Sequence, residues 1–118
     1  MSNIDGQGMD NVTEALSLLQ SRIHATARSK EWWERERNDY ELIALMHSQL
    51  SEAVEGLRAG NPTDDKIPAF TAAEAELADT VIRILDMAEA RGWRVGAAIL
   101  AKMAYNEQRA YRHGGKLA

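Results

Sequence analysis

The sequence predicts an all-α fold of the four-helix bundle kind. Apolar residues recur at three- and four-residue steps, strand-like alternation is almost absent, and only two prolines interrupt 118 residues. A chain of this length can form one domain around one hydrophobic core. We therefore expect a single all-α domain over residues 10–113, with a flexible N-terminus (1–9) and a flexible tail (114–118).

The first helix is predicted from about residue 10 to residue 28, with Asp10 or Asn11 as its N-cap. It carries an apolar stripe formed by Val12, Ala15, Leu16, Leu19, Ile23 and Ala27. Trp32 and Trp33 follow in very polar surroundings. We expect one indole to pack on the end of the bundle and the other to lie at an interface. The alternative is that one of them stacks on a nucleobase or another flat ligand.

The second helix is predicted over residues 39–59, and the turn sequence Gly60-Asn61-Pro62 ends it. Gln49, Glu52 and Glu55 follow one another at three-residue steps. Each step turns about 60° further from the apolar side of the helix. Gln49 is therefore expected to border the core, Glu52 to lie at its shoulder, and Glu55 to lean toward water.

The third helix is predicted to start at a Thr71-x-x-Glu74 capping box and to end near Arg91-Gly92. Apolar side chains cover most of its circumference, which is typical of a buried helix. One narrow polar stripe interrupts them, formed by Glu76, Asp79, Arg83 and Asp86. Buried carboxylates need partners, because an unpaired buried charge costs several kcal/mol. Arg83, a bound cation or a second chain could supply them.

The fourth helix is predicted over residues 95–111, before Gly114-Gly115. Its expected inward residues are Ile99, Leu100, Met103 and Ala104. Lys102, Asn106 and Arg109 share a polar face.

Composition and charge exclude several classes of function. The chain has no cysteine, which excludes disulfides, thiolate metal sites and cysteine nucleophiles. Its net charge of −4 disfavours nonspecific binding to nucleic acids. The apolar runs are too short to cross a bilayer, and no secretory signal pattern is present, so we expect a cytoplasmic protein without a membrane partner. Residues 41–79 carry a charge of −6 and residues 91–118 a charge of +5, which could hold a cation beside a polyanion.

Two short acidic motifs on different predicted helices are the strongest chemical signal. One is Glu52-x-x-Glu55, or Gln49-x-x-Glu52 in the other register, and the second is Glu76-x-x-Asp79. Each motif places two oxygen ligands on one helical face, and hard divalent cations prefer such ligands. The alternative is a buried salt-bridge stripe with Arg83. No Glu-x-x-His pair, Walker loop or Gly-x-Ser-x-Gly elbow occurs.

These motifs resemble those of the MazG-like, all-α nucleoside triphosphate pyrophosphohydrolase superfamily. The resemblance rests on three stretches: His47–Glu55, Glu76–Asp79 and Lys102–Arg109. It covers roughly residues 38–116. It implies a MazG-type bundle that is completed as a homo-dimer or homo-tetramer. It also implies Mg²⁺-dependent hydrolysis of a nucleoside triphosphate between its α- and β-phosphates, giving a monophosphate and pyrophosphate.

The resemblance also implies roles for individual residues. Mg²⁺, or Mn²⁺ in its place, would be held by Glu52, Glu76 and Asp79, with help from Gln49 or Glu55. Glu52 or Glu55 could take a proton from the attacking water. Lys102, Asn106 and Arg109 would grip phosphate oxygens, and Trp32, Trp33 or Tyr105 could contact the base.

Gln49 departs from the family pattern, because it is a neutral amide where a carboxylate is expected if Gln49-x-x-Glu52 is the functional register. Nothing is missing if the pair is Glu52-x-x-Glu55. Two alternatives to an active enzyme follow. One is a metal- or nucleotide-binding relative with weakened catalysis, and the other is a helical oligomerisation module whose acids only form salt bridges.

Overall fold

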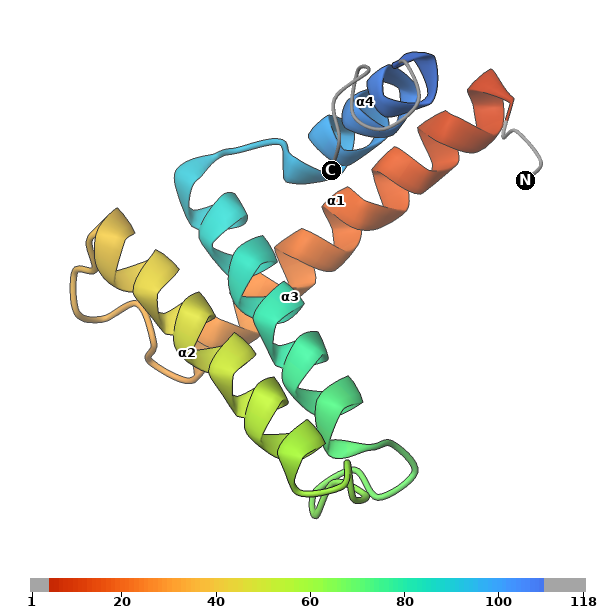
Figure 1. Ribbon diagram of the computed structural model, residues 1–118. Coiled ribbons are helices and arrows are strands. Elements are labelled where there is room, and N and C mark those ends of the chain that lie inside the picture. Colours follow the sequence, from red (N-terminus) through yellow and green to blue (C-terminus); the bar gives the residue numbers. More distant parts are fainter. Residues whose placement is uncertain (1–4, 110–118) are drawn as a thin grey trace.

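Four α-helices make up the computed structural model, which describes residues 5–109 (Figure 1). They are α1 (Gly6–Ser29), α2 (Asp39–Arg58), α3 (Ala72–Arg91) and α4 (Val95–Gln108). Over residues 5–109 the only strand-type pairing is an isolated bridge between Thr63 and Thr71. The all-helical prediction is therefore confirmed. Residues 110–118 lie outside the described residues. They include the predicted end of the fourth helix, at residue 111, and the predicted tail, 114–118.

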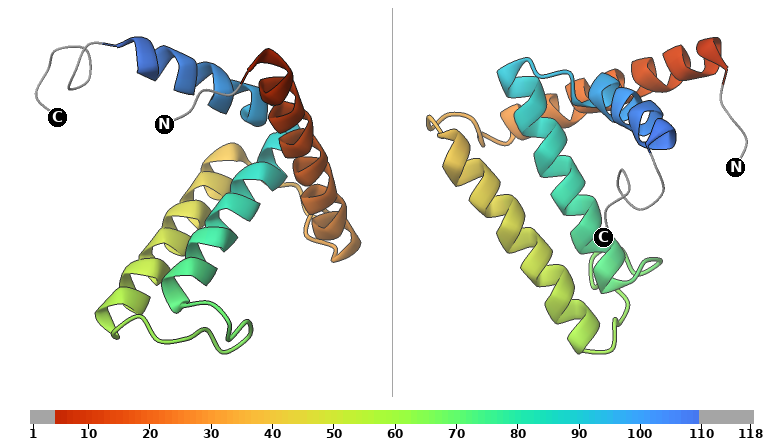
Figure 2. Two further views of the ribbon diagram at one scale, coloured as in Figure 1. Left: turned by 90° about the vertical axis from the view of Figure 1, so that its right-hand side faces the viewer. Right: turned by 45° about the horizontal axis from the view of Figure 1, so that its top comes forward.

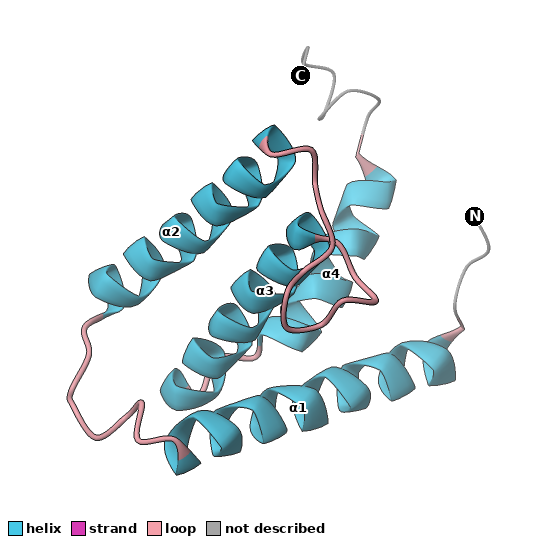
Figure 3. Cartoon of the chain, turned by 90° about the horizontal axis from the view of Figure 1, so that it is seen from below, coloured by secondary structure: helices cyan, strands magenta, loops and turns pink. Residues whose placement is uncertain are grey.

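Helices α2 and α3 form an antiparallel hairpin (Figure 3). At one end Arg91 Nε lies 2.7 Å from Asp39 Oδ1. At the other end Gly56 lies so close to Ala72 that a Cβ at Gly56 would be 3.0 Å from the Ala72 Cβ. The register of the hairpin is thus fixed at both ends, which determines the side chains that meet between the helices.

The other two helices lie at one end of this hairpin (Figure 2). α1 packs on α3, where Gln20 of α1 donates a hydrogen bond to Glu89 of α3 at 3.1 Å. α4 packs on α1, and Gly96 allows a close approach to Leu16 there. The first half of α3 therefore has α2 beside it, whereas the second half has both α2 and α1.

The helix ends follow local sequence signals. Thr71 and Glu74 form the predicted capping box at the start of α3. The hydrogen bonds that Thr71 donates lower the pKa of the Glu74 carboxyl. Gly92 ends α3 in the left-handed conformation (φ 72°), as expected. The predicted start of the first helix is wrong: α1 begins at Gly6, because the Asp5 carboxylate accepts the backbone N–H of Gly8 and caps it.

Burial along α3 also differs from the prediction. The run Leu85–Ala88 is buried, but Leu77 and Val81 are 50% and 52% exposed. The prediction of a helix buried on nearly all sides is therefore wrong for the single chain. The reason is that α1 crosses only the second half of α3, and α4 lies against α1 instead of completing a bundle around α3.

A row of exposed apolar residues runs along each helix of the hairpin. Leu50, Val54 and Leu57 form the row on α2, and Leu77, Val81 and Ile84 form the row on α3. Each of these residues follows by one position a residue at or near the contact between the helices. In an antiparallel pair a step of one residue, about 100°, turns both side chains toward the same face. The six residues therefore share one side of the hairpin, which we term the apolar hairpin face.

Candidate functional site

The two acidic motifs meet where α2 faces α3. Gln49 of α2 donates a hydrogen bond from Nε2 to the carboxylate of Glu76 on α3. Arg83, two turns further along α3, donates from Nε to the Gln49 carbonyl oxygen at 3.1 Å. All three side chains are partly buried. The structure thus brings together one member of each predicted motif, with Arg83 attached to them through Gln49.

The remaining acidic candidates are exposed. Glu52 follows Gln49 by three residues, and Asp79 follows Glu76 by three. In the antiparallel hairpin these equal steps turn both carboxylates toward one side, opposite the apolar hairpin face. Glu55 lies further out, with its Oε1 3.8 Å from Arg58 Nη1. Arg83 takes part in no ion pair with a carboxylate among residues 5–109.

The donor set fits a hard divalent cation in its chemistry. Glu52, Glu76, Asp79 and Gln49 offer only oxygen atoms as ligands, which suits Mg²⁺ or Mn²⁺. Its arrangement is less complete, because within residues 5–109 no three acidic or histidine side chains are gathered closely enough to hold a metal ion. The single chain therefore presents a pair of facing helices with oxygen donors and no closed cage of ligands.

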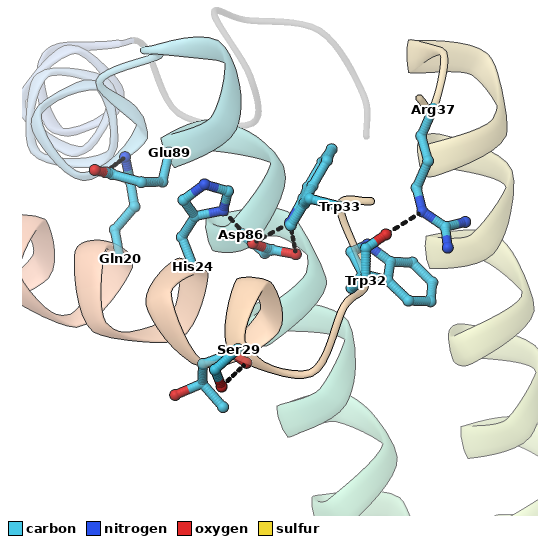
Figure 4. Close-up of polar contacts among 9 residues, drawn as sticks. Gln20, His24, Ser29, Trp32, Trp33, Arg37, Asp86 and Glu89 are labelled. Atoms are coloured by element: carbon cyan, nitrogen blue, oxygen red, sulfur yellow. Dashed lines mark hydrogen bonds and ion pairs between the residues drawn. The ribbon is translucent and has the colours of Figure 1, made fainter. Parts of the chain in front are cut away.

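A second polar cluster lies where α1 crosses α3, around the buried carboxylate of Asp86 (Figure 4). Trp33 Nε1 donates to both Asp86 oxygens, at 3.0 and 3.1 Å. His24 Nδ1 lies 2.7 Å from Asp86 Oδ1. Because a carboxylate only accepts hydrogen bonds, we assign the histidine proton to Nδ1. Asp86 therefore obtains its partners from α1 and from the segment that links α1 to α2.

Sequence reasoning placed Asp86 in the polar stripe but missed these partners. His24 and Trp33 lie 62 and 53 residues away along the chain. The available signals were a histidine beside the apolar stripe of the first helix and the tandem tryptophans that follow it. Neither signal identifies which carboxylate the two residues contact.

Trp33 has both a structural and an exposed side. It packs against the core residues Leu42, Met46 and Met87, which confirms that one indole packs on the bundle. It also borders a surface cavity of about 540 Å³. That cavity is lined by His24, Arg28, Trp33, Glu34, Ala90 and Arg91. The lining thus combines an indole, an imidazole and two guanidinium groups with one carboxylate, Glu34.

Trp32 lies on the side of the acidic residues. Its ring has the Arg37 guanidinium carbon 3.7 Å and the Arg83 guanidinium carbon 5.1 Å from its centroid. It lines a second hollow of about 320 Å³, whose charged lining residues are Lys30, Asp79, Arg83 and Asp86. The exposed carboxylate of Asp79 thus shares a hollow with two cationic side chains and an indole, a combination suited to a phosphate-bearing aromatic ligand.

The residues predicted to bind phosphate lie on α4 and at its C-cap, Arg109. Lys102 Nζ lies 5.2 Å, and the Arg109 guanidinium carbon 5.8 Å, from the centroid of the Tyr105 ring. Arg109 donates to Asn106 Oδ1 at 3.3 Å. α4 packs on α1 and lies at the opposite end of α3 from Glu76 (Figure 1). The structure therefore keeps this group together but does not bring it to the acidic motifs of the same chain.

Comparison of the chain with protein family models, with curated proteins and with solved structures finds no match. No helix within residues 5–109 is both long enough and apolar enough to cross a membrane.

Proposed function

We propose that the protein is a Mg²⁺-dependent nucleoside triphosphate pyrophosphohydrolase of the MazG-like type. It would cleave between the α- and β-phosphates and release a nucleoside monophosphate and pyrophosphate. The observation that carries the proposal is the contact between Gln49 and Glu76, which sets the two acidic motifs on facing helices. The hollow beside Asp79, with its two cations and its indole, supports it.

In this proposal Glu52, Glu76 and Asp79 hold the cation, and Mn²⁺ can replace Mg²⁺. When bound there, the cation would supply neutralisation of phosphate charge and Lewis-acid activation of water. Glu52 or Glu55, both exposed, accepts the proton of the attacking water. Trp32, Trp33 and Tyr105 are the candidate contacts for the base. Trp32 lines the hollow beside Asp79, Trp33 borders the other cavity, and Tyr105 stands exposed beside Lys102 and Arg109.

We infer a homo-dimer or homo-tetramer from the apolar hairpin face. Its six residues lie on one side of the hairpin and are all exposed in the single chain. A contiguous apolar face of this kind marks an interaction surface. Because α4 lies apart from the acids of its own chain, we assign the phosphate contacts of Lys102, Asn106 and Arg109 to the acidic motifs of a neighbouring copy.

A second candidate function is a metal- or nucleotide-binding relative with weakened catalysis. Gln49 favours it, because its amide brings no charge to the cation and its two ends are already hydrogen-bonded to Glu76 and Arg83. A third, the oligomerisation module without activity, draws support from the apolar hairpin face alone.

The proposal is tested by incubating the protein with a panel of ribo- and deoxyribonucleoside triphosphates and Mg²⁺. We expect monophosphate and pyrophosphate in equal amounts, and no turnover by the variant Glu76→Gln. Glu14→Gln, an exposed site on α1, is the matched control and should retain full activity. Release of a nucleoside diphosphate and inorganic phosphate would contradict the proposal, and so would a lack of hydrolysis of every triphosphate in the panel. Stabilisation by Mg²⁺ without turnover would support the weakened relative.

The neighbouring-copy assignment is tested by mixing two inactive variants, Glu76→Gln and Lys102→Ala. If Lys102 serves the acids of another copy, mixed oligomers contain some sites with both residues intact and regain activity. Lack of recovery after the chains have been shown to exchange would contradict the assignment.

A further inference from the structure

Gln49 occupies a position that suits an amide better than a carboxylate. Its two neighbours at the contact between α2 and α3 differ in kind: an ionised Glu76 only accepts hydrogen bonds, and Arg83 only donates them. The Gln49 side chain offers one donor end and one acceptor end. The donor end reaches Glu76 and the acceptor end receives Arg83 Nε at 3.1 Å.

A glutamate in the same place would match only one neighbour. It could accept from Arg83, but it would set a second negative charge against Glu76 and leave that carboxylate without its donor. In a partly buried position such a like-charge contact is destabilising. Gln49 therefore allows Glu76 to be held by protein groups alone.

We propose that Gln49 is a positioning residue that couples Arg83 to Glu76 and holds the Glu76 carboxylate at the α2–α3 contact in the absence of metal. For its consequence on metal binding, this inference rests on the proposed function. Gln49 is neither a ligand nor a base in this account. The cation is attracted by the charges of Glu52, Glu76 and Asp79, one carboxylate fewer than a site with glutamate at position 49 would offer.

The coupling is tested first without metal, on thermal unfolding in EDTA. The variants are Gln49→Met, Arg83→Met and the double variant, since methionine matches glutamine in length and keeps the unbranched apolar stem of arginine. Arg83→Met should lower Tm by roughly 4–8 °C, the shift that accompanies the loss of one net hydrogen bond in a small domain. Gln49→Met should lower Tm by at least as much, because it removes the bonds to both Glu76 and Arg83. The double variant should lower Tm by clearly less than the sum of the two single shifts. The reason is that either substitution alone already breaks the connection from Arg83 through Gln49 to Glu76.

Additive shifts would overturn the coupling. Arg83 also lies near the Trp32 ring, but that contact does not involve Gln49 and so does not enter the non-additive part of the cycle. The measurement needs neither metal nor substrate. Its outcome therefore tests the coupling independently of the proposed enzyme activity.

The second test is Gln49→Glu, followed by thermal unfolding in EDTA and by Mg²⁺ titration. Without metal the variant should unfold several degrees below the natural protein. Its affinity for Mg²⁺ should be about tenfold tighter, since affinity for hard cations rises with the number of ligand charges. Glu55→Gln, one turn after Glu52 on α2 and outside the Gln49 contacts, is the control and should leave Tm in EDTA unchanged.

An unchanged Tm in EDTA for Gln49→Glu would overturn the positioning role. Failure of Mg²⁺ to bind either protein would contradict the proposed function and the metal-binding consequence. In that case a non-additive metal-free cycle would still establish the coupling between Gln49 and Arg83. The two failures are therefore distinguishable.

Discussion

The two halves of α3 differ in the burial and hydrogen bonding of carboxylates that belong to the same polar stripe. In the second half Asp86 is 6% exposed and receives hydrogen bonds from His24 and Trp33. In the first half Asp79 is exposed, although both residues line the same hollow. The two residues lie two turns apart on the same side of the helix. The difference between them comes from the rest of the chain, because α1 crosses only one of the two halves.

This comparison separates a carboxylate that supports the fold from one that is available to a ligand. Asp86 accepts hydrogen bonds from donors of its own chain, so its removal leaves those partly buried donors without a partner. Asp79 takes part in no ion pair within residues 5–109, so its removal should change little in the folded state. Glu76 is intermediate, since it is partly buried and held by Gln49.

The largest effect should come from Asp86→Ala. Loss of the carboxylate leaves the Trp33 N–H and the His24 N–H without an acceptor in a partly buried site, which costs about 2 kcal/mol of unfolding free energy. The matched control is Asp79→Ala, two turns earlier on the same face, and it should change stability by less than about 0.5 kcal/mol. Urea denaturation measures both. Equal losses in the two variants would remove the distinction between the halves of α3.

An effect of similar size should come from the contact between α4 and α1. Because α4 packs there, it does not cover the first half of α3. A Cβ at Gly96 would lie 2.8 Å from the Leu16 Cβ, so Gly96→Ala must push the two helices apart. We expect a loss of about 2 kcal/mol, as for other overpacked contacts. Gly6→Ala is the control, because apart from its chain neighbours and the backbone of its own helix no atom of residues 5–109 lies within 4 Å of its Cβ position. A neutral Gly96→Ala would mean that α4 does not pack closely against α1.

A smaller effect of opposite sign should come from the turn that brings Trp33 to Asp86. Glu31 adopts the left-handed conformation (φ 67°) just after α1, and the Trp32 N–H returns to the Ala27 carbonyl at 3.1 Å. Glycine adopts this conformation without steric cost, so Glu31→Gly should raise stability by about 1 kcal/mol. Glu31→Ala keeps a Cβ and should not reproduce the gain. A gain of equal size from alanine would assign the effect to the lost charge.

The smallest effect should be on the pH dependence of stability, through Glu74 in the first turn of α3. Thr71 donates to the Glu74 carboxylate, which lowers the pKa of that group in the folded state below its ordinary value of 4.5. Its contribution is therefore fully present above that ordinary value and is lost as the pH falls through the lower folded-state pKa. Glu74→Gln should flatten the decline of stability below about pH 4.5. Parallel pH profiles for the two proteins would contradict this role of the capping box.

Local signals predicted much of the fold because each depends on neighbouring residues. Helix periodicity, the Thr71–Glu74 box and the Gly92 cap are of this kind, and the structure contains all three. The early start of α1 was missed because Asp5 stands among glycines that resemble a loop. The contact of Gln49 with Glu76 was suggested but not fixed by the helical wheel, which places residues on faces without stating which faces meet.

Burial and partner choice could not be predicted in the same way. A wheel shows that α3 is apolar on nearly all sides, but it does not show that α1 and α4 leave half of the helix open. The partners of Asp86 depend on the crossing of α1 over α3 and on the turn at Glu31. Both are tertiary features without a local pattern.

The most direct test of the proposed site between α2 and α3 is a comparison of pyrophosphate release by the natural protein and by Glu76→Gln, with Mg²⁺ and with EDTA. We expect Mg²⁺-dependent release by the natural protein and a loss of at least about 100-fold in the variant, because the substitution removes a proposed metal ligand. Unfolding curves of the two proteins confirm that both are folded. Equal release by a folded Glu76→Gln protein would contradict the assignment of the α2–α3 contact as the catalytic site.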